Sequence, residues 1–328
     1  LTKSRFKMAT ECPTKLFYTG KKEYPNTMLD DPFLAALADG GHQVGELAKQ
    51  YYPNGFDITT LDYDEAEKQT LELLALDEVV IFEPAIRFNN LFIRVDVLVK
   101  KGNHFELIEV KAKSYSAKDN GDFHNKKGDK LDSKWKPYID KAVQLAYDTE
   151  LTTGMPVHSF KENITALAKF YQEDQKIVPV IKKKCKTCEF QCSQADEKDG
   201  KLSGFKACWK EQLHWSDTDF NDKTVLDIWN FRGADKCIEQ GVIKLVDVTP
   251  EHIGEVENNN TSLAPKERQW LQVEKEQNKD TSIYFDTDSM RNVMASWTYP
   301  LHFIDFETSA VAIPFYKGMR PYEGIAFQ

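Results

Sequence analysis

The pattern of apolar and polar positions is most regular over residues 93–113, where it predicts a β-hairpin. Two runs rich in Val and Ile, Ile93–Lys100 and His104–Lys113, flank the short turn Lys101-Gly102-Asn103. A Gly-Asn pair between two such runs is typical of hairpin connections. We therefore expect the rest of the chain to be organised around this hairpin.

Apolar residues at helical spacing predict helices elsewhere, and one further apolar run predicts a strand. The first helix is expected to begin at Ser4 and to break at Cys12-Pro13, because proline disfavours helix in the residue before it. In the second helix, Gly40-Gly41 is expected to divide the segment and to place His42 near the start of the second half. The expected helices cover residues 4–18, 32–51, 62–76 and 135–153, the strand covers 79–88, and 217–276 alternate short helical stretches with polar breaks.

Composition narrows the class of protein. The chain has 328 residues, enough for one large domain or two ordinary ones, and its 41% hydrophobic and 12% aromatic content excludes a mostly disordered chain. The formal net charge of −9 gives no global sign of nucleic-acid binding, although local patches decide the local potential. No apolar run approaches the roughly 18 residues of a membrane span, and no secretory signal opens the chain. We expect a cytoplasmic protein with no membrane partner, and numbering that omits a start, since the first residue is Leu1.

The hairpin carries candidate catalytic chemistry. Asp96 lies in the middle of the first strand among valines, where a lone carboxylate is costly to bury without a partner. Because strand side chains alternate between faces, Glu109 and Lys111 are expected on one face and Val110 on the other. Two carboxylates and the Val110 carbonyl can hold a hard divalent cation, Mg²⁺ or Mn²⁺, and the lysine can assist phosphodiester cleavage. The same triplet also occurs on solvated strand faces that carry only a salt bridge.

The cysteines form a second candidate site. Six cysteines without a secretory signal favour metal ligands over disulfides. Cys12 stands far upstream of a group that comprises a CxxC pair and two later thiols, namely Cys185, Cys188, Cys192 and Cys208. One N-terminal cysteine and a later trio can form a four-thiolate site for zinc or for an iron–sulfur cluster. A redox pair or small buried residues would explain single cysteines equally well, and Cys237 is expected to be buried in a helix.

Several short motifs occur in a fixed order along the first two thirds of the chain. In chain order they are Ser4-Arg5, Glu11-Cys12-Pro13-X-Lys15-Leu16-Phe17-Tyr18, His42-X-Val44-Gly45, Asp96, Glu109-Val110-Lys111, Gln144-X-X-Tyr147 and the late cysteines. This order resembles the PD-(D/E)XK nucleases of the RecB/AddB type, specifically the iron–sulfur branch that includes the CRISPR-adaptation exonucleases. The resemblance covers about residues 1–215.

The resemblance implies a role for each motif. The divalent cation would be bound by His42, Asp96, Glu109 and the Val110 carbonyl, and the catalytic residues would be Asp96, Glu109 and Lys111. Gln144 and Tyr147 would contact DNA. A [4Fe–4S] cluster would be held by Cys12, Cys185, Cys188 and Cys208, with zinc as the alternative occupant. The chain departs from the compact final spacing of that family, so Cys192 is the alternative fourth ligand.

A second acidic signal lies near the end of the sequence. Residues 301–308 predict a strand with Asp305 and Glu307 on one face. This stretch resembles the first motif of DEDD-type 3′–5′ exonucleases of the ribonuclease-H-like fold, in which such acids bind two metals. Residues 312–322 resemble uncharacterised bacterial proteins that join a RecB-like nuclease to such a domain. No third or fourth acid of that motif set follows before Gln328, so we expect this second site to be incomplete, and an exposed acidic strand is the alternative.

These interpretations predict an α/β fold with a restriction-endonuclease-like core, in which helices flank a mixed central sheet. A cysteine-ligated metal-cluster lobe and a helical connecting region would complete it. The expected domains are a PD-(D/E)XK nuclease domain over 1–215, a helical connecting region over 216–295 and the truncated start of a DEDD exonuclease-like domain over 296–328.

The expected function is that of a metal-dependent deoxyribonuclease, an exonuclease on duplex ends or single strands that uses a metal-activated water. The lysine-rich segments Lys126–Lys136 and Lys182–Lys186 would contact phosphates, or would simply be solvated surface. The alternative is a non-catalytic nucleic-acid-binding module with a structural zinc or iron–sulfur site, working in a larger repair or defence complex. A redox protein that uses the CxxC pair is a third interpretation.

Overall fold

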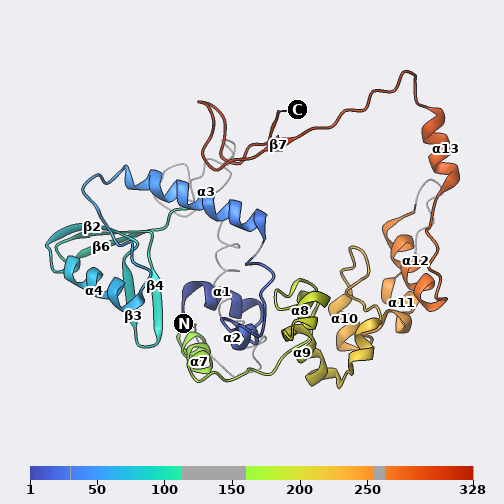
Figure 1. Ribbon diagram of the computed structural model, residues 1–328, viewed down its shortest axis with the longest axis horizontal. Helices are drawn as coiled ribbons and strands as arrows, with labels where there is room; N and C mark the ends of the chain where they lie inside the picture. The colour runs from blue at the N-terminus through green and yellow to red at the C-terminus, as the bar shows by residue number, and fades with distance from the viewer. Residues whose placement is uncertain (30, 113–159, 255–262, 328) are drawn as a thin grey trace. The chain divides into compact units, whose positions relative to one another are not determined.

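The computed structural model describes residues 1–29, 31–112, 160–254 and 263–327 (Figure 1). The chain divides into two compact units. The first unit comprises Leu1–Phe17, Thr27–Val178 and Asp305–Gln328, and the second comprises Tyr18–Asn26 and Pro179–Ile304. All strands in the described ranges belong to the first unit, whereas the second is built from helices and short 3₁₀ turns.

The N-terminal helix breaks where the sequence predicts. Helix α1 spans Lys3–Glu11 and α2 spans Lys15–Tyr18, with Cys12 and Pro13 between them. The helix begins one residue before the predicted start, because Thr2 rather than Ser4 provides the cap, accepting a hydrogen bond of 3.3 Å from the Arg5 N–H. Helix α7 (Phe160–Gln172) packs on α1 around a small buried cluster, which consists of Ala9, Leu16, Leu167 and Ile177.

Helix α3 runs without interruption from Pro32 to Lys49, so the predicted division at Gly40-Gly41 is wrong. Asp31 caps the helix start, and its carboxylate accepts from the N–H groups of the first turn. Gly40 is buried, and a Cβ there would lie 3.1 Å from Ala312 Cβ and 3.3 Å from Tyr322 Oη. The glycine therefore serves close packing of the C-terminal segment onto α3 and does not end the helix.

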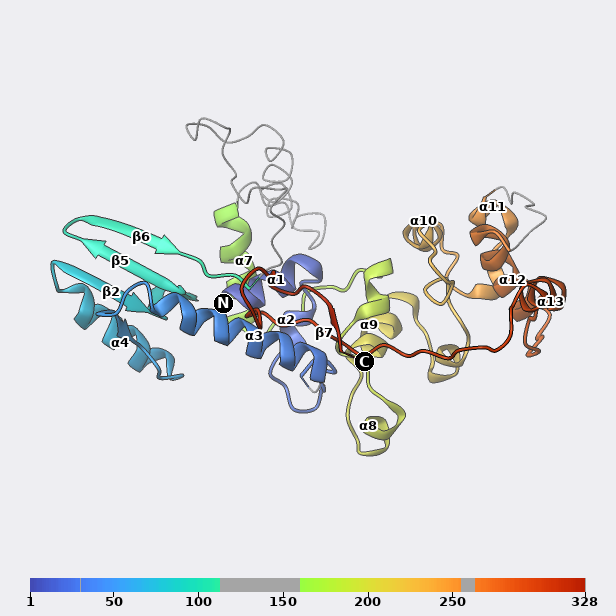
Figure 2. The ribbon, with the colours of Figure 1, turned by 90° about the horizontal axis from the view of Figure 1, so that it is seen from above.

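A small mixed sheet forms the centre of the first unit. Its strand order among the described residues is β1-β2-β5-β6, with β1 (Phe56–Asp57) parallel to β2 (Glu78–Phe82) and the other pairs antiparallel. Strand β5 covers Val97–Lys101 and β6 covers His104–Ile108. Gly102 in the turn has φ +57°, a conformation that glycine adopts at little steric cost. Figure 2 shows β2, β5 and β6 side by side.

Helix α4 (Tyr63–Leu74) covers one face of this sheet (Figures 1 and 2). The Asp62 carboxylate caps the helix by accepting from the N–H groups of Asp64 and Glu65, as the acidic first turn predicts. The core under α4 consists of Ile58, Ala66, Val79, Ile81, Ala85, Phe92 and Leu98. The opposite face carries a second cluster formed by Phe82, Val97 and Val99, with Ile108 and Val110 against it.

Two apolar runs that the sequence predicts as single strands each change sheet partway. The predicted strand over 79–88 divides into β2 and β3 (Ala85–Phe88), and Ile93–Lys100 divides between β4 (Leu91–Arg94) and β5. Strands β3 and β4 pair only with each other among the described strands. The breaks fall at Glu83-Pro84 and Val95-Asp96, which face each other: the Glu83 N–H donates to the Asp96 carbonyl at 3.1 Å. Hydrophobic pattern alone does not mark such a junction.

The second unit contains the cysteine-rich segment and the predicted helical region. Its elements are η2 (Lys183–Thr187), α8 (Gln194–Lys198), α9 (Gly204–Leu213), η3 (Asp217–Asn221), α10 (Ala234–Glu239), η4 (Leu245–Asp247), α11 (Pro250–Ile253), α12 (Pro265–Gln277) and α13 (Thr287–Ala295). Its core packs around the fully buried Trp209, together with Val225, Ile228, Leu245 and Val273. Cys237 is buried in this core, which confirms the expectation of a small buried helical residue.

The protein thus has a mixed α/β architecture with a small mixed sheet and flanking helices. None of the helices in the described ranges has the length and apolar character needed to cross a bilayer. The helix predicted over 135–153 lies outside the described residues.

Candidate functional site

The end of the β5–β6 hairpin brings Asp96 and Glu109 together. Val97 pairs with Ile108 at the last position of the ladder, so the next pair would be Asp96 and Glu109. The backbone ladder stops there, and the Asp96 carboxylate instead accepts a hydrogen bond from the Val110 N–H. The side chains of Asp96 and Glu109 are 29% and 41% exposed, so both carboxylates can be reached from solvent.

Lys111 lies against both carboxylates. Its ammonium forms an ion pair with Glu109 Oε1 and lies 3.9 Å from Asp96 Oδ2. The hydrogen bond that Lys111 donates to Glu109 raises the pKa of Lys111, which keeps this ammonium charged. The arrangement therefore provides one permanent cation beside two carboxylates.

A second lysine, which sequence reasoning missed, also reaches Glu109. Lys3, in the first turn of α1, forms an ion pair with the same oxygen of Glu109 that Lys111 contacts. Hydrogen bonds from Lys111 and then Lys3 hold the pKa of the Glu109 carboxyl below its ordinary value. No local sequence signal marks Lys3, because it lies 106 residues from Glu109 and only the fold joins them.

Glu83 is another nearby acid that the sequence analysis passed over. Its backbone adopts φ +52°, which is uncommon outside glycine, and its N–H binds the Asp96 carbonyl. Burial raises the pKa of Glu83, Arg94 opposes the increase, and the carboxylates of Asp96 and Asp57 add to it. The sequence feature that could have indicated Glu83 is an acid directly before Pro84, at the end of an apolar strand.

Arg94 stabilises the backbone at the two strand breaks, Glu83-Pro84 and Val95-Asp96. Its guanidinium donates to the carbonyl oxygens of Ile58 at 2.7 Å, Thr60 at 2.9 Å and Glu83 at 3.2 Å. These carbonyls belong to two separate segments of the first unit, the connection between β1 and α4 and the end of β2. Arg94 thereby fixes the backbone from which Asp96 projects.

The other predicted cation ligands are placed differently. His42 lies in the middle of α3 and is exposed, and the Val110 N–H, not its carbonyl, makes the contact with Asp96. In the part of the chain that the structure describes, no group of three or more His, Cys, Asp or Glu side chains is gathered as a metal site. Gln144 and Tyr147 lie outside the described residues.

The predicted cluster ligands fall in both units. Cys12 follows α1 in the first unit, whereas the remaining ones, Cys185, Cys188 and Cys208, belong to the second. All are half-buried thiols. The Tyr18 hydroxyl lies 3.3 Å from Cys208 Sγ, and the Lys182 N–H lies 3.4 Å from Cys185 Sγ. The Lys182 N–H donates to Cys185 Sγ, and such a donor suits a thiolate, which is the form that binds metal.

Cys192, the alternative fourth ligand, has a different environment. Burial raises the pKa of its thiol, and the nearby carboxylates of Asp196 and Glu197 raise it further. A raised pKa disfavours the thiolate that a metal ligand requires.

The second acidic pair does not lie on a strand. Residues 301–307 have no regular structure, and β7 begins only at Thr308 and pairs with β8 (Ile325–Ala326). Asp305 and Glu307 are both exposed. The predicted strand over 301–308 is thus wrong for all but its last residue.

Comparisons with known proteins bear on the C-terminal segment. Residues 302–328 match a family model described as "Domain of unknown function (DUF2779)". No curated protein and no solved structure matches the chain.

Proposed function

We propose that the protein is a metal-dependent deoxyribonuclease that hydrolyses phosphodiester bonds at the end of the β5–β6 hairpin. The observation that carries the proposal is the register that sets Asp96 opposite Glu109, with Lys111 against both carboxylates. The finer fold would be a restriction-endonuclease-like core. The substrates would be DNA single strands or duplex ends.

The residues present suit a hard divalent cation, because carboxylate oxygens are the ligands that Mg²⁺ and Mn²⁺ prefer. Asp96 and Glu109 would hold the cation, with His42 and the Val110 carbonyl as further ligands. When bound, the cation supplies Lewis-acid activation of water and of the scissile phosphate. Glu109 is ion-paired with two lysines, so cation binding requires that these ammonium groups move away from it.

Each lysine then has its own task. Lys111 would orient the attacking water or offset the negative charge that develops on the phosphate. Lys3 would neutralise Glu109 while no cation is bound. Because the side chains of both residues are open to solvent, Lys3 can move away when a cation binds. The Asp96 carboxylate is held in place by the Val110 N–H, so its position does not depend on either lysine.

We propose in addition that a structural [4Fe–4S] cluster is held by Cys12, Cys185, Cys188 and Cys208, with zinc as the alternative. Support comes from the Tyr18 hydroxyl, which lies 3.3 Å from Cys208 Sγ, and from the partial solvent exposure of all four thiols. On anaerobically purified protein, Cys208→Ser should lower the iron content and the visible absorbance. Cys192→Ser should leave both unchanged. If Cys192→Ser lowers them and Cys208→Ser does not, Cys192 is the fourth ligand instead of Cys208.

The nuclease proposal is tested by cleavage of 5′- and 3′-labelled single-stranded and double-stranded DNA with Mn²⁺ or Mg²⁺. Lys111→Ala should abolish cleavage, whereas Lys101→Ala, a matched exposed lysine at the other end of the hairpin, should not. Asp96→Ala should abolish cleavage while folding and DNA binding remain.

The alternative is a nucleic-acid-binding module without catalysis. The pairing of Glu109 with both Lys3 and Lys111 favours it, because this pairing opposes cation binding. Binding of DNA by a folded protein that cleaves with neither metal would establish this alternative. Cleavage that Lys111→Ala leaves intact would contradict the assigned role of the lysine.

A further inference from the structure

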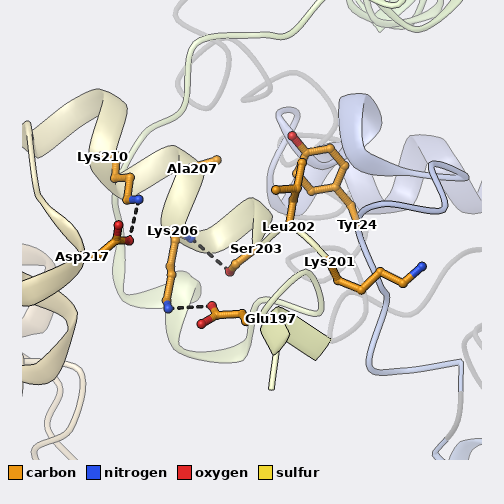
Figure 3. Close-up of a pocket in the computed structure, with 9 residues that line it drawn as sticks. All are labelled: Tyr24, Glu197, Lys201, Leu202, Ser203, Lys206, Ala207, Lys210 and Asp217. Carbon is orange, nitrogen blue, oxygen red and sulfur yellow. Dashed lines mark hydrogen bonds and ion pairs between the residues drawn. The ribbon is translucent and has the colours of Figure 1, made fainter. Parts of the chain in front are cut away.

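A cavity of about 310 Å³ lies in the second unit, against helix α9 (Figure 3). Three lysines line it: Lys201, which precedes the helix, and Lys206 and Lys210 on the helix itself. Because Lys206 and Lys210 are four residues apart, they lie on the same helical face. Figure 3 shows both side chains leaving α9 toward the same side.

Each ammonium group of the cavity is held by an acceptor that a phosphate can replace. Lys206 Nζ lies 2.6 Å from Glu197, Lys210 Nζ lies 2.6 Å from Asp217, and Lys201 Nζ lies 2.9 Å from the Lys22 carbonyl. The Asp217 side chain is 78% exposed, so it can swing into water. Exposed ion pairs contribute little to stability, so exchanging the Lys210–Asp217 pair for a phosphate costs little. The Lys206–Glu197 pair is half-buried, with side chains 31% and 34% exposed, so its exchange costs more.

The opposite side of the cavity is apolar and aromatic. Tyr24 and Leu202 line it, and the Leu202 N–H donates to the Glu23 carbonyl at 2.8 Å, which holds the two segments together. Tyr24 is half-buried, with its ring centroid 4.7 Å from that of Tyr18. Lysines and an aromatic ring that line one cavity are the groups that bind single-stranded nucleic acid, through phosphate contacts and base stacking.

We propose that this cavity binds a nucleotide unit of a DNA single strand, with Lys206 and Lys210 on its phosphates and Tyr24 against a base. Glu197 and Asp217 occupy the ammonium groups until the strand displaces them. The choice of DNA as the ligand rests on the proposed nuclease function. The cavity is a binding site only, and cleavage is assigned to the β5–β6 hairpin.

The test measures binding without cleavage, on the full chain in EDTA, by fluorescence anisotropy of a labelled oligodeoxythymidylate over a NaCl series. Lys206→Gln/Lys210→Gln should weaken binding about tenfold at low salt. It should also reduce the slope of log K against log salt by about 1.4, since each phosphate contact in a single strand contributes about 0.7. The control is Lys223→Gln/Lys236→Gln, two lysines of the same unit that do not line the cavity.

A second variant guards against a folding defect. Glu197→Gln/Asp217→Asn removes the competing carboxylates, so it should bind the strand more tightly than the wild-type chain. Equal affinity and slope for the lysine variant and its control would overturn the proposal, and so would weaker binding by the carboxylate variant. Displacement of the strand by inorganic phosphate at matched ionic strength would overturn it in favour of a small phosphate ligand.

The two proposals fail separately. If wild-type protein cleaves DNA but the lysine pair does not affect binding, the cavity proposal alone is lost. If the lysine pair controls binding but no metal supports cleavage, the nuclease proposal alone is lost. Asp96→Ala should bind the oligonucleotide as the wild type does.

Discussion

Two pairs of acids in the first unit are both candidate metal ligands in the sequence, and they differ in structure. Asp96 and Glu109 flank a paired hairpin, where the register Val97–Ile108 sets them opposite each other. Asp305 and Glu307 lie two residues apart in a segment without regular structure, and both are exposed. A site requires more than the right residue types at alternate positions, because only a paired strand fixes where those side chains point.

The surroundings differ as well. Glu109 contacts two lysines and Asp96 accepts from a backbone N–H, so the hairpin acids have defined partners. In the C-terminal segment, the Asp305 carboxylate accepts from the N–H of its neighbour Phe306 at 2.9 Å. The hairpin therefore provides a preorganised pair of carboxylates.

The largest expected effect is on cleavage. Glu109→Gln should lower the rate of DNA cleavage with Mn²⁺ by about a hundredfold or more, because a bound cation is worth several kcal/mol and about 1.4 kcal/mol is tenfold. The matched change in the other pair, Glu307→Gln, should keep the rate within about twofold. Equal losses in both variants would show that the two acidic pairs act together.

The next effect is on stability. Arg94→Met removes the hydrogen bonds of the guanidinium to three backbone carbonyls beside the hairpin, so the free energy of unfolding should fall by about 2–3 kcal/mol. Arg87→Met removes surface ion pairs with Asp64 and Glu67 and should cost at most about 1 kcal/mol. Urea denaturation of both variants measures the difference, and a cost for Arg87→Met equal to that for Arg94→Met would contradict the account.

A smaller effect is expected at the hairpin turn. Gly102 has φ +57°, so Gly102→Ala should destabilise the protein by about 1–2 kcal/mol through backbone strain. In the C-terminal segment, a Cβ at Gly324 would meet no atom within 4 Å and its φ is not positive, so Gly324→Ala should be almost neutral. Thermal unfolding of the two variants is the measurement. If Gly102→Ala is as neutral as Gly324→Ala, residue 102 does not adopt the positive φ of this turn.

The smallest effect concerns pH. The lysine hydrogen bonds lower the folded-state pKa of Glu109, so its stabilising contribution is fully present above the ordinary glutamate value, about 4.3. That contribution is lost as the pH falls through the folded-state pKa. Lys3→Met should move the Glu109 pKa back toward the ordinary value, as followed by ¹³C NMR of the carboxyl group. A pKa that does not change would mean that Lys3 does not hold this carboxylate in solution.

Local signals predict much of the fold. Asp62 and the acidic residues after it mark the start of α4, and Pro13 marks the break between α1 and α2. Each of these features is decided within a few residues by capping or by proline geometry, so the sequence suffices. The hairpin turn at Gly102 belongs to the same group.

Features decided by distant contacts were missed. Gly40 was interpreted as a helix break, yet it permits the approach of Ala312, which lies far away in the sequence. The sheet changes at Glu83 and Asp96 depend on a hydrogen bond between them and on Arg94. Lys3 was missed for the same reason. The sequence therefore indicates the candidate residues on the hairpin itself, Asp96, Glu109 and Lys111. It does not indicate Lys3, because this partner is supplied by helix α1.

The proposed divalent-cation site at Asp96 and Glu109 can be measured by Mn²⁺ binding, followed by electron paramagnetic resonance. The account predicts that the wild-type chain binds Mn²⁺ and that Asp96→Asn loses this binding while Asp305→Asn keeps it. Binding that Asp96→Asn retains in full, or that only Asp305→Asn loses, would contradict the account.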